Sequence, residues 1–270
     1  MSGVLAAARV EAASLTRLAR VRGALLLCLL GPAVFAATVD GSQSLPADTL
    51  FGRELHDSGF AVPVVVLGFV GTWGLPALTA VVAGDVFATE DAAGTWPALL
   101  TRAMTRGQLF AAKVLAASAY SVVVLVVLAA SSLAAGLLVV GAQPLQGVDG
   151  TLLAPGPAVA GVLLSWLVVL PPTLAFTALG VLASVVSRRP TVGVLTPLLL
   201  GLVLQLLGVL PGIDRLRRLL PTTPFAGWHG LLASPRYDGP LLWGTAVSAG
   251  WVLVLLCVAW AVVQRREHAA

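Results

Sequence analysis

Side chains that could carry out chemistry are few in this sequence, and they are far apart. The three histidines, His56, His229 and His268, follow no metal-ligand spacing, and a metal site needs several such ligands close together. The two cysteines, Cys28 and Cys257, lie within apolar runs, so we interpret them as small packing residues and not as a disulfide. The sequence therefore predicts no metal site.

Motifs of the common catalytic and phosphate-binding sites are also missing. G-x-S-x-G, which marks one kind of nucleophilic serine, does not occur, and no pair of carboxylates lies within an apolar run for acid–base work. The motif G-x-x-x-x-G-K-[ST] does not occur either, so the chain has no P-loop with which to bind ATP. We expect no catalytic residue and no cofactor.

One polar stretch lies between two long apolar runs, EDAAGTWPALLTRAMTR at residues 90–106. Pro97 suits the first turn of a helix, where its missing N–H costs nothing, with Thr95 or Trp96 as the N-cap. Gly107 would end that helix, and Glu90 would lie just before its positive end. The stretch predicts a short helix over residues 95–106.

The expected helix has an apolar face next to a basic stripe. Its apolar face consists of Leu99, Leu100, Ala103 and Met104, and its basic stripe of Arg102 and Arg106, four residues apart. From the residues alone, two functions stay open for this helix. It could anchor in lipid headgroups, or it could dock a soluble partner.

The composition is that of a membrane protein. Of the 270 residues, 58% are hydrophobic and 10% charged, the mean hydropathy is +0.97, and a soluble domain carries about a quarter charged residues. Stretches long enough to cross about 30 Å of hydrocarbon lie within residues 23–39, 58–84, 114–148, 150–187, 190–213 and 239–264. Backbone groups in lipid must be satisfied internally, so we expect an all-α fold with six spans in residues 23–264.

The basic residues predict the orientation of these spans. Eleven arginines and lysines fall on one side and five on the other, so the positive-inside rule places both termini in the cytoplasm. Residues 1–22 would form an interfacial helix with Arg9, Arg17 and Arg20 on one face, and residues 265–270 a cytoplasmic tail. The net charge is +4, and we expect the basic residues to contact anionic membrane lipids. Nucleic acid is not expected as a partner, because the sequence has no basic patch interleaved with aromatic residues.

Several further features shape the expected bundle. Pro171 and Pro172 should kink the fourth span. Glycines at 68, 71 and 74 would allow close helix approach along the second span. Residues 212–239 contain prolines, and their longest uncharged stretch is too short for a seventh span. We therefore expect a re-entrant excursion at the outer surface.

The first apolar run has a second interpretation as a signal peptide. Residues 23–37, GALLLCLLGPAVFAA, end in small residues that resemble a cleavage site. However, 22 residues precede the run, which is long for the segment before a signal sequence. We therefore favour a retained first span.

The stretch EDAAGTWPALLTRAMTRGQLFAAKVLAA resembles the signature of type-2 ABC transporter permeases, the membrane subunits of exporters. That family shows an acidic residue, Gly-Thr, a Leu-Leu-Thr-like run, an arginine, and a lysine that opens the third span. The matching residues are Glu90, Gly94, Thr95, Leu99, Leu100, Thr101, Arg106 and Lys113. Ala103 departs from the pattern, because many members carry proline there. Six spans, an interfacial helix and an outer excursion are also features of the family.

The resemblance implies that residues 90–106 include a coupling helix, which would dock on a separate ATPase subunit. The residues expected to couple to that subunit are Glu90, Gly94, Thr95, Leu99, Leu100, Arg102, Met104 and Arg106. The chain would then be the permease of an ATP-driven exporter of a hydrophobic or amphiphilic substrate in the bacterial cell membrane, paired with a second copy or a related chain. The alternatives are a secondary carrier or channel, and a membrane anchor protein that transports nothing.

Overall fold

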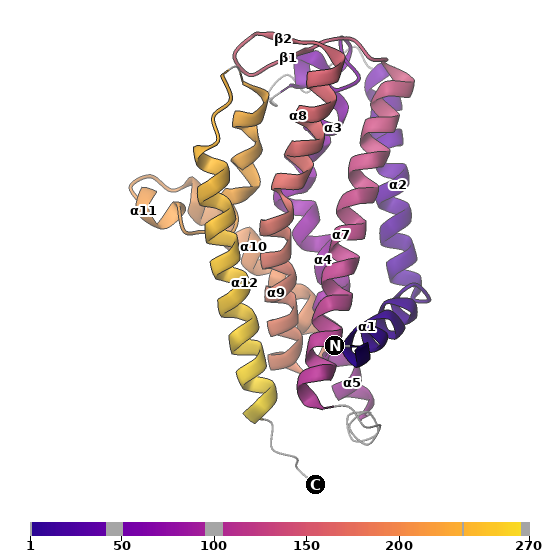
Figure 1. Ribbon diagram of the computed structural model, residues 1–270, viewed down its shortest axis with the longest axis vertical. Coiled ribbons are helices and arrows are strands. Elements are labelled where there is room, and N and C mark those ends of the chain that lie inside the picture. The colour runs from indigo at the N-terminus through magenta and orange to yellow at the C-terminus, as the bar shows by residue number, and fades with distance from the viewer. Residues whose placement is uncertain (1, 42–50, 95–104, 234, 266–270) are drawn as a thin grey trace.

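The computed structural model describes residues 2–41, 51–94, 105–233 and 235–265. Within these ranges, six helices are long and apolar enough to cross a membrane. They run over Ala19–Asp40, Ala61–Ala93, Arg106–Val139, Pro155–Ser187, Pro190–Val209 and Gly239–Arg265. The expected all-α fold with six spans is confirmed. The helix that starts at Ala19 and the helix that ends at Arg265 have these ends directed toward the same end of the bundle, which we call the lower end (Figure 1).

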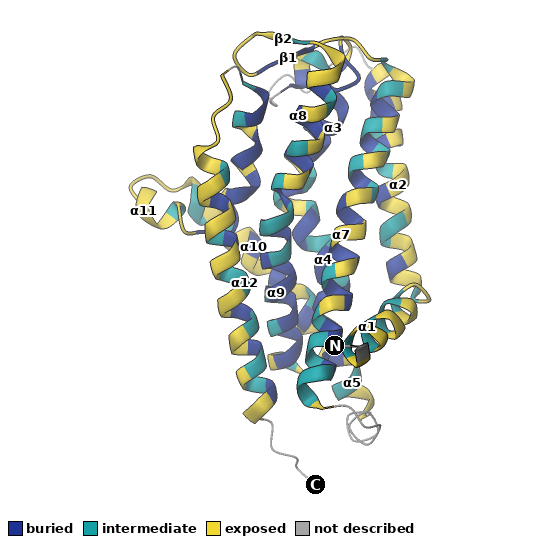
Figure 2. Ribbon diagram, viewed as in Figure 1, coloured by how far each residue is buried: buried dark blue, intermediate teal, exposed yellow. Residues whose placement is uncertain are grey.

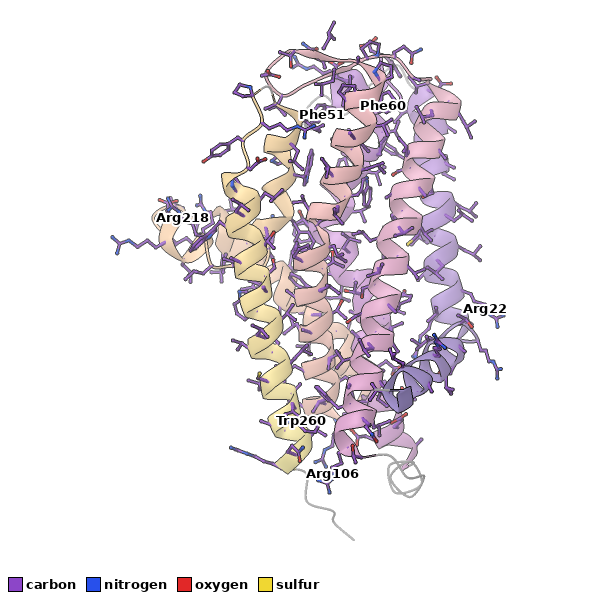
Figure 3. The ribbon with its side chains drawn as sticks, viewed as in Figure 1. Arg22, Phe51, Phe60, Arg106, Arg218 and Trp260 are labelled. Carbon is purple, nitrogen blue, oxygen red and sulfur yellow. The ribbon has the colours of Figure 1, made fainter. Side chains whose placement is uncertain are left out.

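The N-terminal helix is shorter than expected and lies across the bundle (Figure 1). α1 (Ser2–Leu15) ends before α2 (Ala19–Asp40) begins, because Leu18 is extended and caps α2. Arg22 Nε donates to the Thr16 carbonyl, 2.8 Å away, across the bend (Figure 3). The expectation of one helix over 1–22 is wrong in this respect, since Arg20 belongs to α2 and not to the crosswise helix. The membrane placement of α1 stays a prediction.

The second span is built from several pieces. After η1 (Gly52–Leu55) it comprises α3 (Ala61–Phe69), the π-helical η2 (Val70–Gly74), α4 (Leu75–Ala83) and α5 (Ala88–Ala93). Pro76 enters α4 in its first turn and has no N–H to donate to the preceding turn. The missing bond accounts for a change of winding at η2.

The glycines of the second span do not make the close contact that we expected. A Cβ added at Gly68 would meet nothing within 4 Å, and one at Gly71 would meet only side-chain atoms, 3.8 Å away or more. A Cβ at Gly74 would meet the side chain of Val70, four residues earlier in the same span. Close helix approach occurs instead at Gly84, at the end of α4.

The third span begins earlier than its apolar run. α7 (Arg106–Val139) starts eight residues before Val114, so the polar segment that precedes the run is already helical. Above it, β1 (Leu145–Gln146) and β2 (Leu152–Leu153) pair antiparallel and cover the upper end of the bundle (Figure 1).

The fourth span is broken in the middle, as expected. α8 (Pro155–Val168) ends and α9 (Leu170–Ser187) begins on either side of Val169, directly before Pro171 and Pro172. Neither proline has an N–H, so the ladder of helical hydrogen bonds is interrupted there. The predicted kink is confirmed.

The rest of the chain runs from the fifth span to the sixth. α10 (Pro190–Val209) is followed by the single turn α11 (Asp214–Arg217), by η3 (Thr223–Leu232) and by α12 (Gly239–Arg265). Among the described residues between α10 and α12, none belongs to a helix long enough to span a membrane. α11 projects from the side of the bundle (Figure 1).

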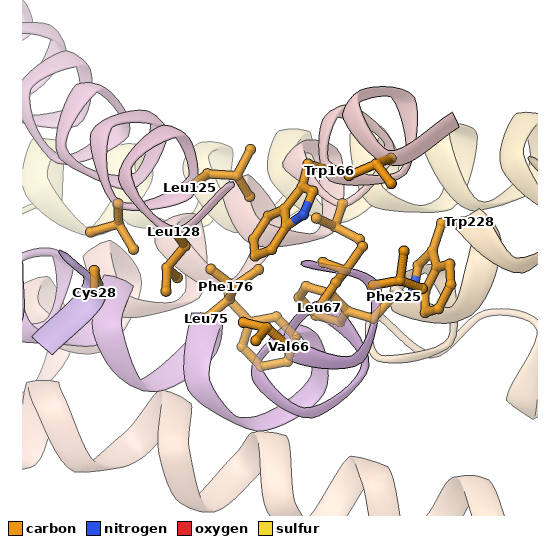
Figure 4. Close-up of a cluster of buried hydrophobic side chains, with 14 of the residues drawn as sticks. Cys28, Val66, Leu67, Leu75, Leu125, Leu128, Trp166, Phe176, Phe225 and Trp228 are labelled. Carbon is orange, nitrogen blue, oxygen red and sulfur yellow. The ribbon is translucent and has the colours of Figure 1, made fainter. Parts of the chain in front are cut away.

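The core lies along the middle of the bundle, where α3, α4, α7, α8, α9 and η3 meet. Its largest side chains include Trp166, Phe176 and Phe225, each at most 3% exposed (Figure 4). The outer faces of α2, α10 and α12 are apolar but exposed (Figure 2). Exposed leucines and valines over whole helix faces are what a lipid environment requires.

Candidate functional site

Lys113 of α7 is a buried cation at the lower end of the bundle, only 1% exposed. Its Nζ lies 2.5 Å from Glu90 Oε1 of α5 and 3.3 Å from Glu11 Oε1 of α1. The same Nζ lies 5.8 Å from the ring centroid of Phe87. A buried charge is costly unless it is paired, so this lysine ties three elements together.

Asp85 forms a second ionic contact beside the first. This carboxylate follows α4 and is 3% exposed. It accepts a hydrogen bond from the guanidinium of Arg20 in α2 and another from the hydroxyl of Thr89 in α5. The start of the first span is thereby joined to the segment that leads from α4 into α5.

The first turn of α5 is held by a side chain of another helix. The first N–H groups of a helix have no partner within it. Here Ser184 Oγ of α9, fully buried, accepts from the backbone N–H of Phe87 at 3.0 Å and of Ala88 at 2.9 Å. α5 is therefore fixed to α9 through its first backbone N–H groups and to α7 through Glu90. Lys113 links it further to Glu11 of α1, and Asp85 links Thr89 of α5 to Arg20 of α2.

Glycines let the backbones touch beside this cluster. A Cβ added at Gly193 of α10 would lie 1.8 Å from the carbonyl oxygen of Gly84, and one at Gly180 of α9 would lie 2.8 Å from the Cβ of Ala83. No side chain fits at these distances. Three spans thus pack with backbone contact at the point where the second span ends.

The start of α7 is joined to the end of the last span. Phe110 of α7 lies between Phe87 and Trp260 of α12, with ring centroids 5.7 and 5.3 Å apart. Arg106 Nη1 donates to the Gln264 carbonyl at 3.4 Å. Figure 3 shows Arg106 and Trp260 close together at the lower end. Aromatic packing therefore runs from the polar cluster to the opposite side of the bundle.

The segment expected to form the coupling helix is held at both ends. α5 ends at Gly94, whose positive φ of 65° suits glycine and stops a helix. α7 begins with a capping box, in which Thr105 accepts from the Gln108 N–H and the Gln108 side chain accepts from the Thr105 N–H. Five of the eight expected coupling residues, Thr95, Leu99, Leu100, Arg102 and Met104, lie outside the described residues.

The other three expected residues are placed by the structure. Glu90 lies in α5 and contacts Lys113, Gly94 ends α5, and Arg106 is the first residue of α7. The placement of Arg106 at the end of the loop helix is wrong. Thr105 caps a helix that runs on through Gly107, so this glycine does not stop one.

Sequence reasoning missed the residues that hold this segment in place. Glu11, Arg20 and Ser184 lie in α1, α2 and α9, Asp85 lies in the turn between α4 and α5, and no local pattern joins them. One signal was present. Asp85 and Lys113 are isolated charges of opposite sign beside apolar runs, and such charges need partners.

The cluster consists of ion pairs, caps and packed rings. In the described part of the chain, no three histidine, cysteine or carboxylate side chains gather as a metal site would require. The arrangement joins α5 to the first, third and fourth spans.

An apolar cavity lies higher in the bundle, with a volume of about 590 Å³. It opens between α2 and the second span, and α7 contributes Leu128 to its wall. Cys28 of α2 and Val66 of α3, both labelled in Figure 4, are among the residues that line it. Its walls would suit an apolar molecule or a lipid chain.

Two comparisons with known proteins bear on the chain. A family model described as ABC-2 family transporter protein matches residues 21–208. That range covers well over half of the chain and nearly all of the first five spans. It includes Asp85, Glu90, Lys113 and Ser184 of the contacts at the lower end, whereas Glu11 and Arg20 lie before it. The comparison with curated proteins gives no match.

Proposed function

The chain belongs to the ABC-2 family of transporter proteins, and on this premise we propose that it is the permease of an ATP-driven exporter, coupled to a separate ATPase through residues 95–104. As a member of that family it is a multi-pass membrane component of an ABC transporter. The exporter direction, the ATPase subunit and the coupling segment are the proposal.

The observation that carries the proposal is the anchoring of that segment. On one side, Glu90 contacts the buried Lys113 just before Gly94. On the other, Thr105 caps α7 and Arg106 contacts the end of α12. A segment that only lay in lipid headgroups would need no such attachment, whereas a segment that receives force from a partner does.

The same contacts suggest how force would travel. Closure of two ATPase subunits on nucleotide would push on residues 95–104. α5 would pass the movement to α1 and α7 through Lys113, to α2 through Asp85, and to α9 through Ser184. Rigid helices in backbone contact move as a body, so the spans would tilt together.

The partners and substrate follow from the family and from the exposed faces. We expect a second copy or a related permease chain beside this one, and a hydrophobic or amphiphilic substrate, because the described cavity between α2 and the second span is apolar. The bacterial cell membrane is the expected location.

A pull-down tests the proposal most directly. The tagged chain would be isolated in mild detergent from its native membrane, and proteins bound to it would be identified by mass spectrometry. We expect an ATPase with a Walker motif to bind to the native chain. Scrambling residues 97–104 while keeping Thr105 and its cap should abolish this binding. Recovery of the same ATPase with the scrambled chain would refute the coupling role.

A further inference from the structure

Three arginines lie on or beside α11, the single turn that projects from the bundle, and they have different roles. Arg217 closes the turn, because its Nη2 donates to the Leu210 carbonyl at 2.8 Å and its Nη1 lies 3.3 Å from Asp214 Oδ1. Arg215 and Arg218 are exposed. In the described part of the chain their guanidinium groups make no hydrogen bond and no ion pair.

The depth of the turn is fixed by two tryptophans of α12. Trp243 Nε1 donates to the Arg218 carbonyl at 2.9 Å, and Trp251 Nε1 donates to the Leu219 carbonyl at 2.8 Å. At a rise of 1.5 Å per residue, these tryptophans lie about 33 and about 21 Å above Arg265, the last described residue of α12. With Arg265 at the inner surface, the turn lies near the outer edge of the hydrocarbon, which is about 30 Å thick.

The surroundings of the turn are apolar on the lipid side. Leu210, Leu216 and Leu219 are each about half exposed, from 50% to 52%. Charged groups at this depth must reach a polar partner, and long arginine side chains do so by extending toward the headgroups. Figure 3 shows Arg218 on the projecting part of the chain, away from the core.

From this geometry we propose that the α11 turn binds an anionic phospholipid of the outer leaflet. Arg215 and Arg218 contact its phosphate, and Leu216 and Leu219 contact its acyl chains. The one carboxylate of the turn, Asp214, is already paired with Arg217, so two positive charges remain to attract a negative headgroup. This inference does not depend on coupling to an ATPase.

The test uses the full chain in phosphatidylcholine vesicles that contain a small fraction of phosphatidylglycerol with a photoreactive acyl chain. After illumination, non-tryptic peptides that cover residues 206–220 are scored for attached lipid. Arg215→Gln with Arg218→Gln should lower this labelling about 25-fold, since each arginine near a surface contributes on the order of a fivefold preference for anionic lipid. Arg215→Lys with Arg218→Lys should keep most of it.

The matched control removes two other exposed arginines outside the six spans, Arg53→Gln with Arg236→Gln. In this control variant, labelling of residues 206–220 should stay within about twofold of that in the native chain. Millimolar inorganic phosphate should likewise change the labelling of the native chain by no more than about twofold. Photoreactive phosphatidylcholine should label the segment weakly and to the same extent in every variant. Equal phosphatidylglycerol labelling in the native chain and the glutamine variant would overturn the proposal. Displacement by inorganic phosphate would show that the site recognises a free anion and not a lipid.

Discussion

Lys113 Nζ lies 2.5 Å from Glu90 Oε1, and this contact joins the third span to the last turn before the proposed coupling segment. The lysine side chain is 2% exposed and the glutamate side chain 19%. Removing one partner of such a shielded ion pair lowers the stability of the folded protein strongly, because the remaining charge stays buried without its partner. The contact is therefore a structural joint whose removal should be measurable.

Lys113→Met should lower stability by about 3 kcal/mol, since Glu90 and Glu11 lose their shared cation. Adding Glu90→Gln to this variant should restore part of the loss. Thermal unfolding of the four corners of this cycle in detergent gives the coupling between the two side chains. If the two losses simply add, the pair is not coupled in the folded protein.

Gly193→Ala should destabilise the bundle by about 2 kcal/mol or more, because the new Cβ would fall 1.8 Å from the Gly84 carbonyl oxygen and force α4 and α10 apart. The control is Gly31→Ala in α2, where the added Cβ meets nothing within 4 Å. That change should be neutral or stabilising by up to about 1 kcal/mol, through helix propensity. The melting temperature should therefore fall in Gly193→Ala and stay the same or rise in Gly31→Ala, and an unchanged melting temperature in Gly193→Ala would argue against the backbone contact.

Ser184→Ala should cost about 1–3 kcal/mol, because two buried N–H groups, those of Phe87 and Ala88, lose their acceptor. Ser165 offers a matched control. It is fully buried in α8, but its hydroxyl donates to the Gly161 carbonyl within the same helix, 2.8 Å away. Ser165→Ala leaves no N–H without an acceptor, so its melting temperature should stay near that of the native chain. Similar losses in both variants would mean that cavity formation, and not the lost acceptor, sets the cost.

Thr105→Ala should shorten the start of α7 and cost about 1 kcal/mol, the usual value of an N-cap, while Thr105→Ser should keep the cap. Hydrogen exchange of residues 106–110 reports directly on the capped turn and should rise only in the alanine variant. In a complex with the proposed ATPase, the alanine variant should also bind less tightly. Unchanged exchange would show that the turn is held by other contacts, such as that of Arg106 with Gln264.

Arg106→Glu should uncouple the proposed exporter without preventing membrane insertion. Arg106 contacts the end of α12, and reversal of its charge would place a carboxylate against the Gln264 carbonyl. Proteoliposomes that hold the permease and its ATPase would report ATP hydrolysis with and without substrate. If substrate stimulates ATP hydrolysis in the Arg106→Glu variant as much as in the native chain, Arg106 takes no part in coupling.

The sequence alone determined the class of fold. Six apolar runs between basic residues predict six spanning helices, because a backbone in lipid must satisfy its own hydrogen bonds. The described residues contain six helices long and apolar enough to span. The break at Val169 was equally accessible, since Pro171 and Pro172 lack the N–H groups that a continuous helix uses. Both features depend on residues that are close together in the sequence, so they can be predicted from the sequence alone.

Only the tertiary structure decided how the lower cluster is assembled. Arg20 contacts the carboxylate of Asp85, which lies 65 residues away in the sequence. Lys113 contacts Glu11, 102 residues away, and Ser184 accepts a hydrogen bond from the N–H of Phe87, 97 residues away. The glycines behave in the same way, because Gly84 and Gly193 are in close contact, whereas a Cβ added at Gly68 would meet nothing within 4 Å. An isolated charge shows that a contact partner is needed, and a glycine in a helix leaves room for one. Which residue is that partner depends on the distances between the spans, and packing sets those distances.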